Sequence, residues 1–163
     1  MVLNYKIDAK LSFTLIVFIL LYSINFYVSD DAFISFRSWE NFINGYYFSY
    51  NIHERVQAYS NVLWTILIGI TKLIFFGLDP DPNNYWVITF YLSLLFSIVT
   101  IVIIYKNILL SHRSASLWIV VFFFAILFTS KSFVDFTSSG LEYPLAYVVI
   151  SYFFFRYFNT DLV

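Results

Sequence analysis

Two adjacent carboxylates, Asp30 and Asp31, directly follow the first long apolar run of the sequence. A carboxylate at a membrane edge can act as a general base towards a hydroxyl group, and a carboxylate pair can bind a divalent cation. The same side chains can instead cap the start of a helix where the chain leaves the membrane. Position alone leaves both interpretations open, so the pair is a candidate catalytic site whose metal dependence is undetermined.

A second polar group, His53-Glu54-Arg55, lies between the first and second apolar runs. The planar guanidinium of Arg55 can bind a phosphate through two parallel hydrogen bonds, and a solvated surface triplet is the alternative interpretation. We expect no zinc site here, because the other histidine of the sequence, His112, is predicted on the opposite side of the membrane.

A third polar group, Ser138-Ser139-Gly140-Leu141-Glu142, precedes the last apolar run. Ser138 or Ser139 can cap the following helix, and the negative charge of Glu142 can complement its N-terminal dipole. An ionisable residue at the edge of a membrane is also a functional candidate, so both roles stay open for Glu142.

The composition indicates which kind of fold must position these groups. Apolar residues make up 61% of the 163 residues and charged residues only 12%, whereas a soluble domain carries about 25% charged residues. Lipid must therefore surround much of the chain. The net charge of −1 argues against a nucleic-acid partner, and the absence of cysteine excludes disulfides and a thiol nucleophile.

The sequence contains five apolar runs: Leu11–Val28, Val62–Leu78, Tyr85–Leu110, Leu117–Phe128 and Leu141–Phe155. A membrane-crossing helix needs about 17–25 residues, and the fourth and fifth runs reach this length only with their flanks. If the second run does not cross, five basic residues near the ends of the other four runs lie on the cytoplasmic side, as the positive-inside rule favours. These residues are Lys6, Lys10, Lys106, Arg113 and Arg156.

The same topology places most of the acidic residues outside the cytoplasm. The predicted fold class is therefore all-α, a polytopic membrane helical bundle of about four transmembrane helices in a single domain over residues 1–163. Residues 29–84 form an external loop with juxtamembrane helices. The first of these, over Asp31–Asn44, carries an apolar stripe, and the second, Val62–Leu78, carries a partly polar stripe that includes Thr65 and Lys72.

Three motifs in this order resemble those of GT-C-type membrane glycosyltransferases, especially the bacterial arabinofuranosyltransferase-like members. Asp30–Arg37 (DDAFISFR) and Tyr50–Trp64 (YNIHERVQAYSNVLW) are similar to the first external loop of that family, and Ser139–Glu142 (SGLE) is similar to a later motif. The chain departs from the family pattern at Ile52-His53, Ala58 and Val62, where the family has Pro-Gly, glycine and proline. It is also shorter than such enzymes, so the resemblance covers only an N-terminal part.

The resemblance implies transfer of a sugar from a polyprenyl-phosphate donor to a cell-envelope glycan or lipid acceptor. The site would lie on the non-cytoplasmic side of the inner (plasma) membrane, and a missing C-terminal portion or partner chain would complete it. One of Asp30 and Asp31 would act as general base, and Arg55 or Lys72 would neutralise the leaving phosphate. The other implied substrate-binding residues are Arg37, Glu54, Tyr59, Ser139 and Glu142.

Two other functions stay open: a transporter component and a non-catalytic membrane subunit. The predicted spans carry almost no charge and the acids gather at their external ends, which counts against transport. The glycosyltransferase interpretation makes a structural prediction, namely that one external cavity brings together Asp30, Asp31, Glu54, Arg55 and Glu142.

Overall fold

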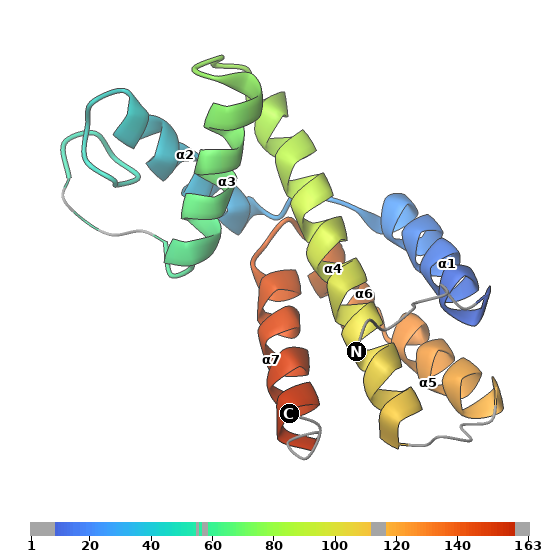
Figure 1. Cartoon of the computed structure of the whole chain (residues 1–163). Helices are drawn as coiled ribbons and strands as arrows, with labels where there is room; N and C mark the ends of the chain where they lie inside the picture. Colours follow the sequence, from blue (N-terminus) through green and yellow to red (C-terminus); the bar gives the residue numbers. More distant parts are fainter. Residues whose placement is uncertain (1–8, 55, 57–58, 112–116, 159–163) are drawn as a thin grey trace.

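The computed structural model describes residues 9–54, 56, 59–111 and 117–158, and these residues form seven α-helices and no β-strand (Figure 1). The all-α prediction is therefore confirmed for the described part of the chain. In chain order the helices are α1 (Ala9–Asn25), α2 (Asp30–Ile43), α3 (Val62–Phe76), α4 (Asn83–Ser111), α5 (Leu117–Thr129), α6 (Lys131–Ser138) and α7 (Tyr143–Phe158).

Among the described helices, α4 alone is both long and apolar enough to cross a membrane by itself, over Asn83–Ile108. Two bent pairs meet the same criterion only if each pair is counted as one span. These are α1 with α2, bent by 82°, and α5 with α6, bent by 68°. Length and composition thus support one span, or up to three, and the four-span bundle stays a prediction.

The long helices are arranged along α4 (Figure 1). α3 runs beside the first half of α4, and the Trp64 ring near the start of α3 lies 6.1 Å from the Phe96 ring. α7 packs along the second half of α4. α1 and α5 lie on the other side, and they run in the direction opposite to α4 and α7.

Two hydrophobic cores hold this arrangement together. The first joins α1, α4, α5 and α6, and the second joins α2, α3 and the start of α4. The buried members of the first core are Phe18, Tyr22, Ile101, Tyr105, Val120, Phe124 and Phe133. Those of the second core are Ala32, Phe36, Trp39, Trp64, Ile68, Tyr85 and Ile88.

The predicted amphipathic helix of the first loop is confirmed as α2. Its apolar stripe belongs to the second core, where the Phe36 ring stacks on the Tyr85 ring of α4 at 4.8 Å. The start of the helix differs from the prediction, because Ser29 occupies the N-cap position and its side chain makes no capping hydrogen bond. Asp30 and Asp31 are instead the first two helical residues, where a negative charge complements the helix dipole.

The predicted polar stripe of α3 faces inwards. Thr65 and Lys72 are buried against α2 and α4, whereas the outer face of the helix is apolar and exposed. α2 crosses α3 at Gly69, where the absence of a side chain admits the indole of Trp39. A methyl group at this position would lie only 2.0 Å from that ring, so the crossing depends on glycine.

A hydrogen-bonded turn connects α3 to α4. The carboxylate of Asp79 accepts hydrogen bonds from the side chain of Asn84 and from the backbone N–H of Asp81. These hydrogen bonds, that of Asn84 first, hold the pKa of Asp79 below its ordinary value, because they favour the ionised form. The turn therefore keeps its negative charge over a wider pH range than a free aspartate.

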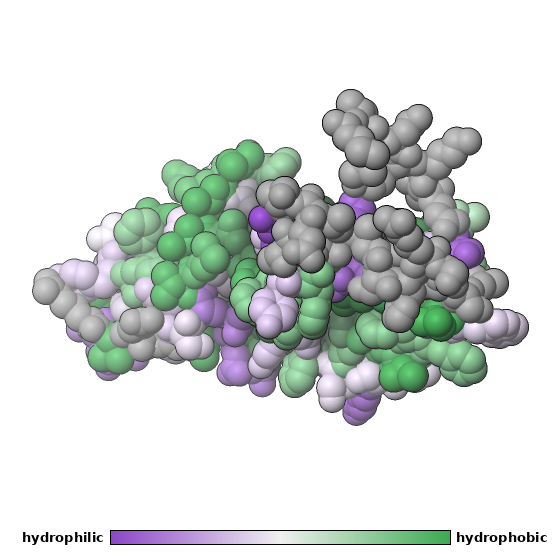
Figure 2. Space-filling view, turned by 60° about the horizontal axis from the view of Figure 1, so that its bottom comes forward, coloured by the Kyte–Doolittle hydropathy of each residue, from purple (hydrophilic) through white to green (hydrophobic). Residues whose placement is uncertain are grey.

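Hydrophobic residues cover broad areas of the molecular surface, and hydrophilic residues form smaller patches (Figure 2). Many of the large apolar side chains on α1, α3, α5 and α7 are more than half exposed, which a water-soluble surface does not favour. This surface agrees with the membrane environment that the composition predicts.

Candidate functional site

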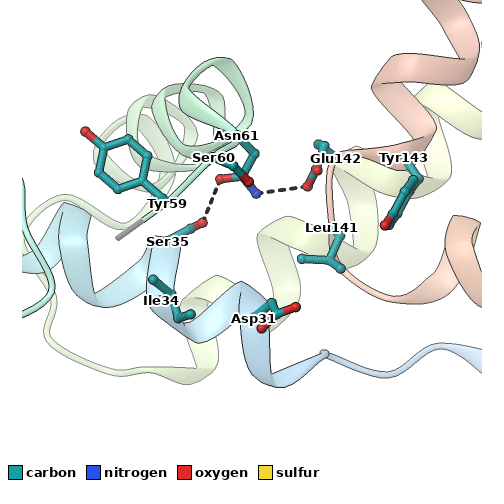
Figure 3. Close-up of a pocket in the computed structure, with 9 residues that line it drawn as sticks. All are labelled: Asp31, Ile34, Ser35, Tyr59, Ser60, Asn61, Leu141, Glu142 and Tyr143. Atoms are coloured by element: carbon teal, nitrogen blue, oxygen red, sulfur yellow. Dashed lines mark hydrogen bonds between the residues drawn. The ribbon is translucent and has the colours of Figure 1, made fainter. Parts of the chain in front are cut away.

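A polar pocket of about 310 Å³ lies where the starts of three helices meet (Figure 3). α2 contributes its first two turns, α3 contributes the segment that leads into it, and α7 contributes its first residues. All three helices point their N-terminal, partially positive ends towards this region, which favours negative charge there. The lining residues are Asp31, Ile34, Ser35, Tyr59, Ser60, Asn61, Leu141, Glu142 and Tyr143.

Asn61 connects the three parts of the pocket through its side-chain amide. Its Nδ2 donates to Oε2 of Glu142 at 2.9 Å, and its Oδ1 accepts from the hydroxyls of Ser35 and Thr65, each at 3.0 Å. The two hydroxyl donors fix the orientation of the amide, so that its NH₂ group faces Glu142. Glu142 is thereby held in one position as a hydrogen-bond acceptor.

Asp31 lies across the pocket from this network and is exposed (Figure 3). The structure therefore brings together Asp31 and Glu142, two of the carboxylates that the sequence predicts in one cavity. Asp30 is exposed but does not line the pocket. Glu54 lies elsewhere, where its carboxylate accepts a hydrogen bond from Asn51 at 2.9 Å. Arg55 lies outside the described residues.

The other predicted substrate-binding residues occupy different settings. Tyr59 lines the pocket, and partial burial raises the pKa of its phenol, which keeps the hydroxyl protonated at neutral pH. Arg37 lies outside the pocket, where its Nε donates to the carbonyl of Tyr50 at 3.0 Å and its guanidinium covers the Tyr50 ring. Arg37 thus holds the first loop against α2.

Lys72 is buried away from the pocket. Its Nζ lies 2.6 Å from Oε1 of Glu40, and Glu40 also accepts a hydrogen bond from the Tyr85 hydroxyl. The ammonium group lies 5.1 Å from the centre of the Tyr85 ring. These contacts join α2, α3 and α4, so Lys72 is engaged in a structural ion pair in this conformation.

Ser139 and Gly140 form the corner that carries Glu142 into the pocket. The backbone N–H groups of Tyr27 and Ser29 donate to the carbonyls of Ser138 and Ser139, each at 2.9 Å. The indole N–H of Trp64 donates to the carbonyl of Gly140 at 3.1 Å. Ser139 is buried and its side chain bonds only within this corner, so it positions the backbone beneath the pocket.

An apolar groove of about 490 Å³ adjoins the polar pocket. It lies between the start of α3 and the first turns of α7, and Leu63, Leu145 and Val149 are among its lining residues. Asn61 and Glu142 line both the groove and the pocket, so the two spaces meet at the Asn61–Glu142 hydrogen bond. Together they form a polar pocket that continues into an apolar groove.

Sequence reasoning missed the roles of Asn61, Ser35 and Glu40. Asn61 directly precedes α3 and lies inside the second motif, so an N-cap role was predictable from its position. Its bond to Glu142, 81 residues later, was not predictable, because no local pattern encodes that contact. The pairing of Glu40 with Lys72, 32 residues later, was not predictable for the same reason.

The pocket can bind a hydroxylated molecule and remove a proton from it, because it combines a solvent-accessible carboxylate with a second carboxylate held by an amide. In the described part of the chain, no three histidine, aspartate or glutamate side chains form a group that could hold a metal ion. No protein-family model, curated protein sequence or solved structure matches this chain. The functional argument therefore rests on the sequence motifs and on this geometry.

Proposed function

We propose that this chain is a GT-C-type glycosyltransferase, or the N-terminal part of one, that transfers a sugar from a polyprenyl-phosphate donor to a cell-envelope glycan or lipid acceptor. The observation that carries the proposal is the polar pocket with Asp31 and Glu142, which continues into an apolar groove. A polyprenyl-phosphate sugar has the matching form, a polar head group on a long hydrocarbon chain. Both spaces lie in the size range of ligand-binding pockets.

In the proposed reaction, Asp31 accepts the proton of an acceptor hydroxyl. The hydroxyl oxygen forms a bond to the anomeric carbon of the donor sugar, and the bond between that carbon and the phosphate oxygen breaks. Polyprenyl phosphate leaves with the bonding electron pair. Glu142, held by Asn61, orients the sugar hydroxyls through hydrogen bonds. A divalent cation at the two carboxylates is compatible with this scheme and is not required by it.

The proposal includes four membrane helices in the plasma membrane, α1, α4, α5 and α7, whose ends remote from the pocket share one cytoplasmic side. The alternating directions of these helices support it (Figure 1). Lys10 near the start of α1, Lys106 near the end of α4 and Arg156 near the end of α7 then lie on one side, the cytoplasmic side under the positive-inside rule. The pocket lies at the opposite ends of α1 and α7.

Transfer from a radiolabelled polyprenyl-phosphate sugar to a cell-envelope acceptor, in proteoliposomes that contain the whole chain, tests the proposal. General-base catalysis contributes about 100-fold or more, so Asp31→Asn should lower the transfer rate by at least that factor. Asp81→Asn, which alters an exposed carboxylate on the α3–α4 turn, is the matched control and should stay within about twofold of the wild type. Equal rates for the wild type and Asp31→Asn would refute the role of Asp31.

Donor binding supplies a second readout that does not need a complete catalytic unit. Ala146→Trp would fill the groove between α3 and α7, and it should weaken binding of the polyprenyl-phosphate sugar at least tenfold. Ile119→Trp, on the exposed face of α5, is the size-matched control. Binding that is absent from the wild type, or unaffected by Ala146→Trp, would exclude this groove as the donor site.

The bent helix pairs favour a second candidate, a transporter component. Discontinuous helices whose break lies at a polar site are common in transporters, and Asp31, next to the break between α1 and α2, lines the polar pocket. Uptake of labelled sugars or amino acids by the same proteoliposomes would distinguish the two functions. Uptake without any transfer would favour the transporter.

A further inference from the structure

α4 provides a scale for depth in the membrane, because its apolar segment runs over Asn83–Ile108. α3 is antiparallel to the first half of this segment. At the start of α3, Trp64 lies beside Phe96, and near its end Lys72 lies beside Tyr85. Tyr85 and Phe96 are eleven residues apart, which corresponds to about 16 Å along a helix axis. α3 therefore lies at the same depth as the first half of the α4 segment.

The polarity of α3 is the reverse of that of a water-facing helix. Two of its three polar or charged side chains, Thr65 and Lys72, are buried, and Lys72 is completely inaccessible. The third, Thr71, is half-buried, and its hydroxyl donates to the carbonyl of Leu67 within the helix at 2.7 Å. Its exposed large side chains are all apolar. They are Val62, Leu63, Ile66, Ile70, Leu73, Ile74 and Phe75. A helix in water presents its polar face outwards, so the outer face of α3 is suited to hydrocarbon.

This apolar face continues onto α4 without interruption. An apolar groove of about 390 Å³ lies between the two helices, with Phe75 on one side and Val87, Tyr91 and Leu95 on the other. Because α4 is the helix that can cross a membrane by itself, the surface beside it is exposed to the same solvent. α2 and α4 cover Thr65 and Lys72, so the charged side of α3 does not face water.

The irregular backbone beneath α3 is also arranged as hydrocarbon requires. Non-helical backbone at membrane depth is tolerated only where other parts of the protein satisfy its hydrogen bonds. The corner between α1 and α2 donates from Tyr27 and Ser29 to the corner between α6 and α7. Trp64, at the start of α3, satisfies the carbonyl of Gly140 in the same place.

We infer that α3 is a half-span. It enters the bilayer from the α3–α4 turn, contacts hydrocarbon along its outer face, and ends beside the polar pocket near the middle of the bilayer. This placement is an alternative to the expected position of Val62–Leu78 on the membrane surface. A hydrocarbon core of about 30 Å puts the pocket, about 16 Å from the level of Tyr85, near mid-depth. The inference does not depend on glycosyl transfer.

Depth-dependent fluorescence quenching tests the half-span. The sequence contains no cysteine, so single substitutions label cleanly. Leu63→Cys, Ile70→Cys and Ile74→Cys lie along one line of the exposed face, and each would carry a bimane label in proteoliposomes of the whole chain. Lipids brominated at different acyl positions report depth, and aqueous iodide reports contact with water. Leu95→Cys on α4 and Asp81→Cys on the turn serve as the deep and water-exposed references.

A half-span predicts labels that become deeper from Ile74→Cys through Ile70→Cys to Leu63→Cys, with the last as deep as Leu95→Cys. The full difference is about 16 Å when α3 is perpendicular to the bilayer. A helix that lies flat on the membrane would place all three labels at one depth, which would overturn the inference. Iodide quenching as strong as that of Asp81→Cys, or no quenching by any brominated lipid, would overturn it as well.

Discussion

At the scale of single residues, the ion pair of Lys72 and Glu40 joins a fully buried charge to a partly exposed one. The side chain of Lys72 is 0% exposed, whereas that of Glu40 is 28% exposed. Removing Glu40 and removing Lys72 therefore have different consequences for the residue that remains. An unpaired ammonium at this position has no access to water, but an unpaired Glu40 keeps solvent and the Tyr85 hydroxyl.

We expect Glu40→Gln to be more destabilising than Lys72→Met. The first change leaves a buried charge without its counter-charge, which costs about 3–5 kcal/mol. The second change removes the buried charge itself and should cost less. Thermal unfolding of the purified protein in detergent micelles measures both effects, and the double variant Glu40→Gln/Lys72→Met should recover part of the loss. A larger loss for Lys72→Met would contradict this account.

The residues of the site were partly predictable. The motif that contains Asp31 and the motif that contains Glu142 were expected to meet, and both residues line one pocket. The role of Lys72 as a phosphate ligand stays a prediction that its pairing with Glu40 does not favour. A sequence shows that a lysine lies on an apolar helix, but not which distant carboxylate neutralises it.

At the scale of elements, the crossing of α2 over α3 depends on one close contact. The Trp39 indole lies where a side chain at Gly69 would project, and both residues belong to the buried faces of their helices. This contact sets the distance between the two helices. It therefore also sets where Ser35 of α2 meets Asn61 at the start of α3.

Gly69→Ala should destabilise the protein by about 1–3 kcal/mol, because the added methyl group overlaps the Trp39 ring. Ile70→Ala, at the neighbouring exposed position, is the control and should change stability by less than about 0.5 kcal/mol. Unfolding in detergent micelles measures both. If the overlap is the cause, Trp39→Leu should be less damaging in the Gly69→Ala background than alone. Strictly additive losses would exclude this explanation.

Helices whose apolar residues recur with a clear helical period were predictable. The direction in which their faces point, towards protein or towards solvent, was not. α2 follows from its apolar stripe, and its observed bounds differ from the predicted ones by a single residue at each end. For α3 the sequence contains the polar stripe, but periodicity does not tell whether that stripe faces water or protein. α6 was not predicted as a separate helix, because its eight residues are too few to establish a period.

At the scale of the whole molecule, the shared direction of α4 and α7 makes a prediction about the two membrane sides. In intact cells, Asp81→Cys on the α3–α4 turn should react with a membrane-impermeant maleimide added outside. Arg156→Cys near the end of α7 should react only after the membrane is opened. Both positions are exposed, and the cysteine-free sequence gives no background labelling. Reaction of both variants from the outside would refute the topology.

Composition predicted the helices and their apolar surface, but not the breaks between helices. The chain turns by 82° between α1 and α2 and by 68° between α5 and α6. The first turn contains neither glycine nor proline, so nothing in its local sequence marks the bend. Tertiary contacts determine it, above all the backbone bonds between the two corners.

Those backbone bonds have a consequence for biosynthesis. Ser29 receives its partner, the carbonyl of Ser139, about 110 residues later in the chain. At typical ribosomal speeds this delay is about 5–20 s, during which the first corner must be accommodated without its final contacts. The pocket and the Trp64–Gly140 bond cannot form before that point. The site is therefore completed late in membrane insertion, and a ribosome that stalls before Ser138 leaves a nascent chain whose first corner remains open.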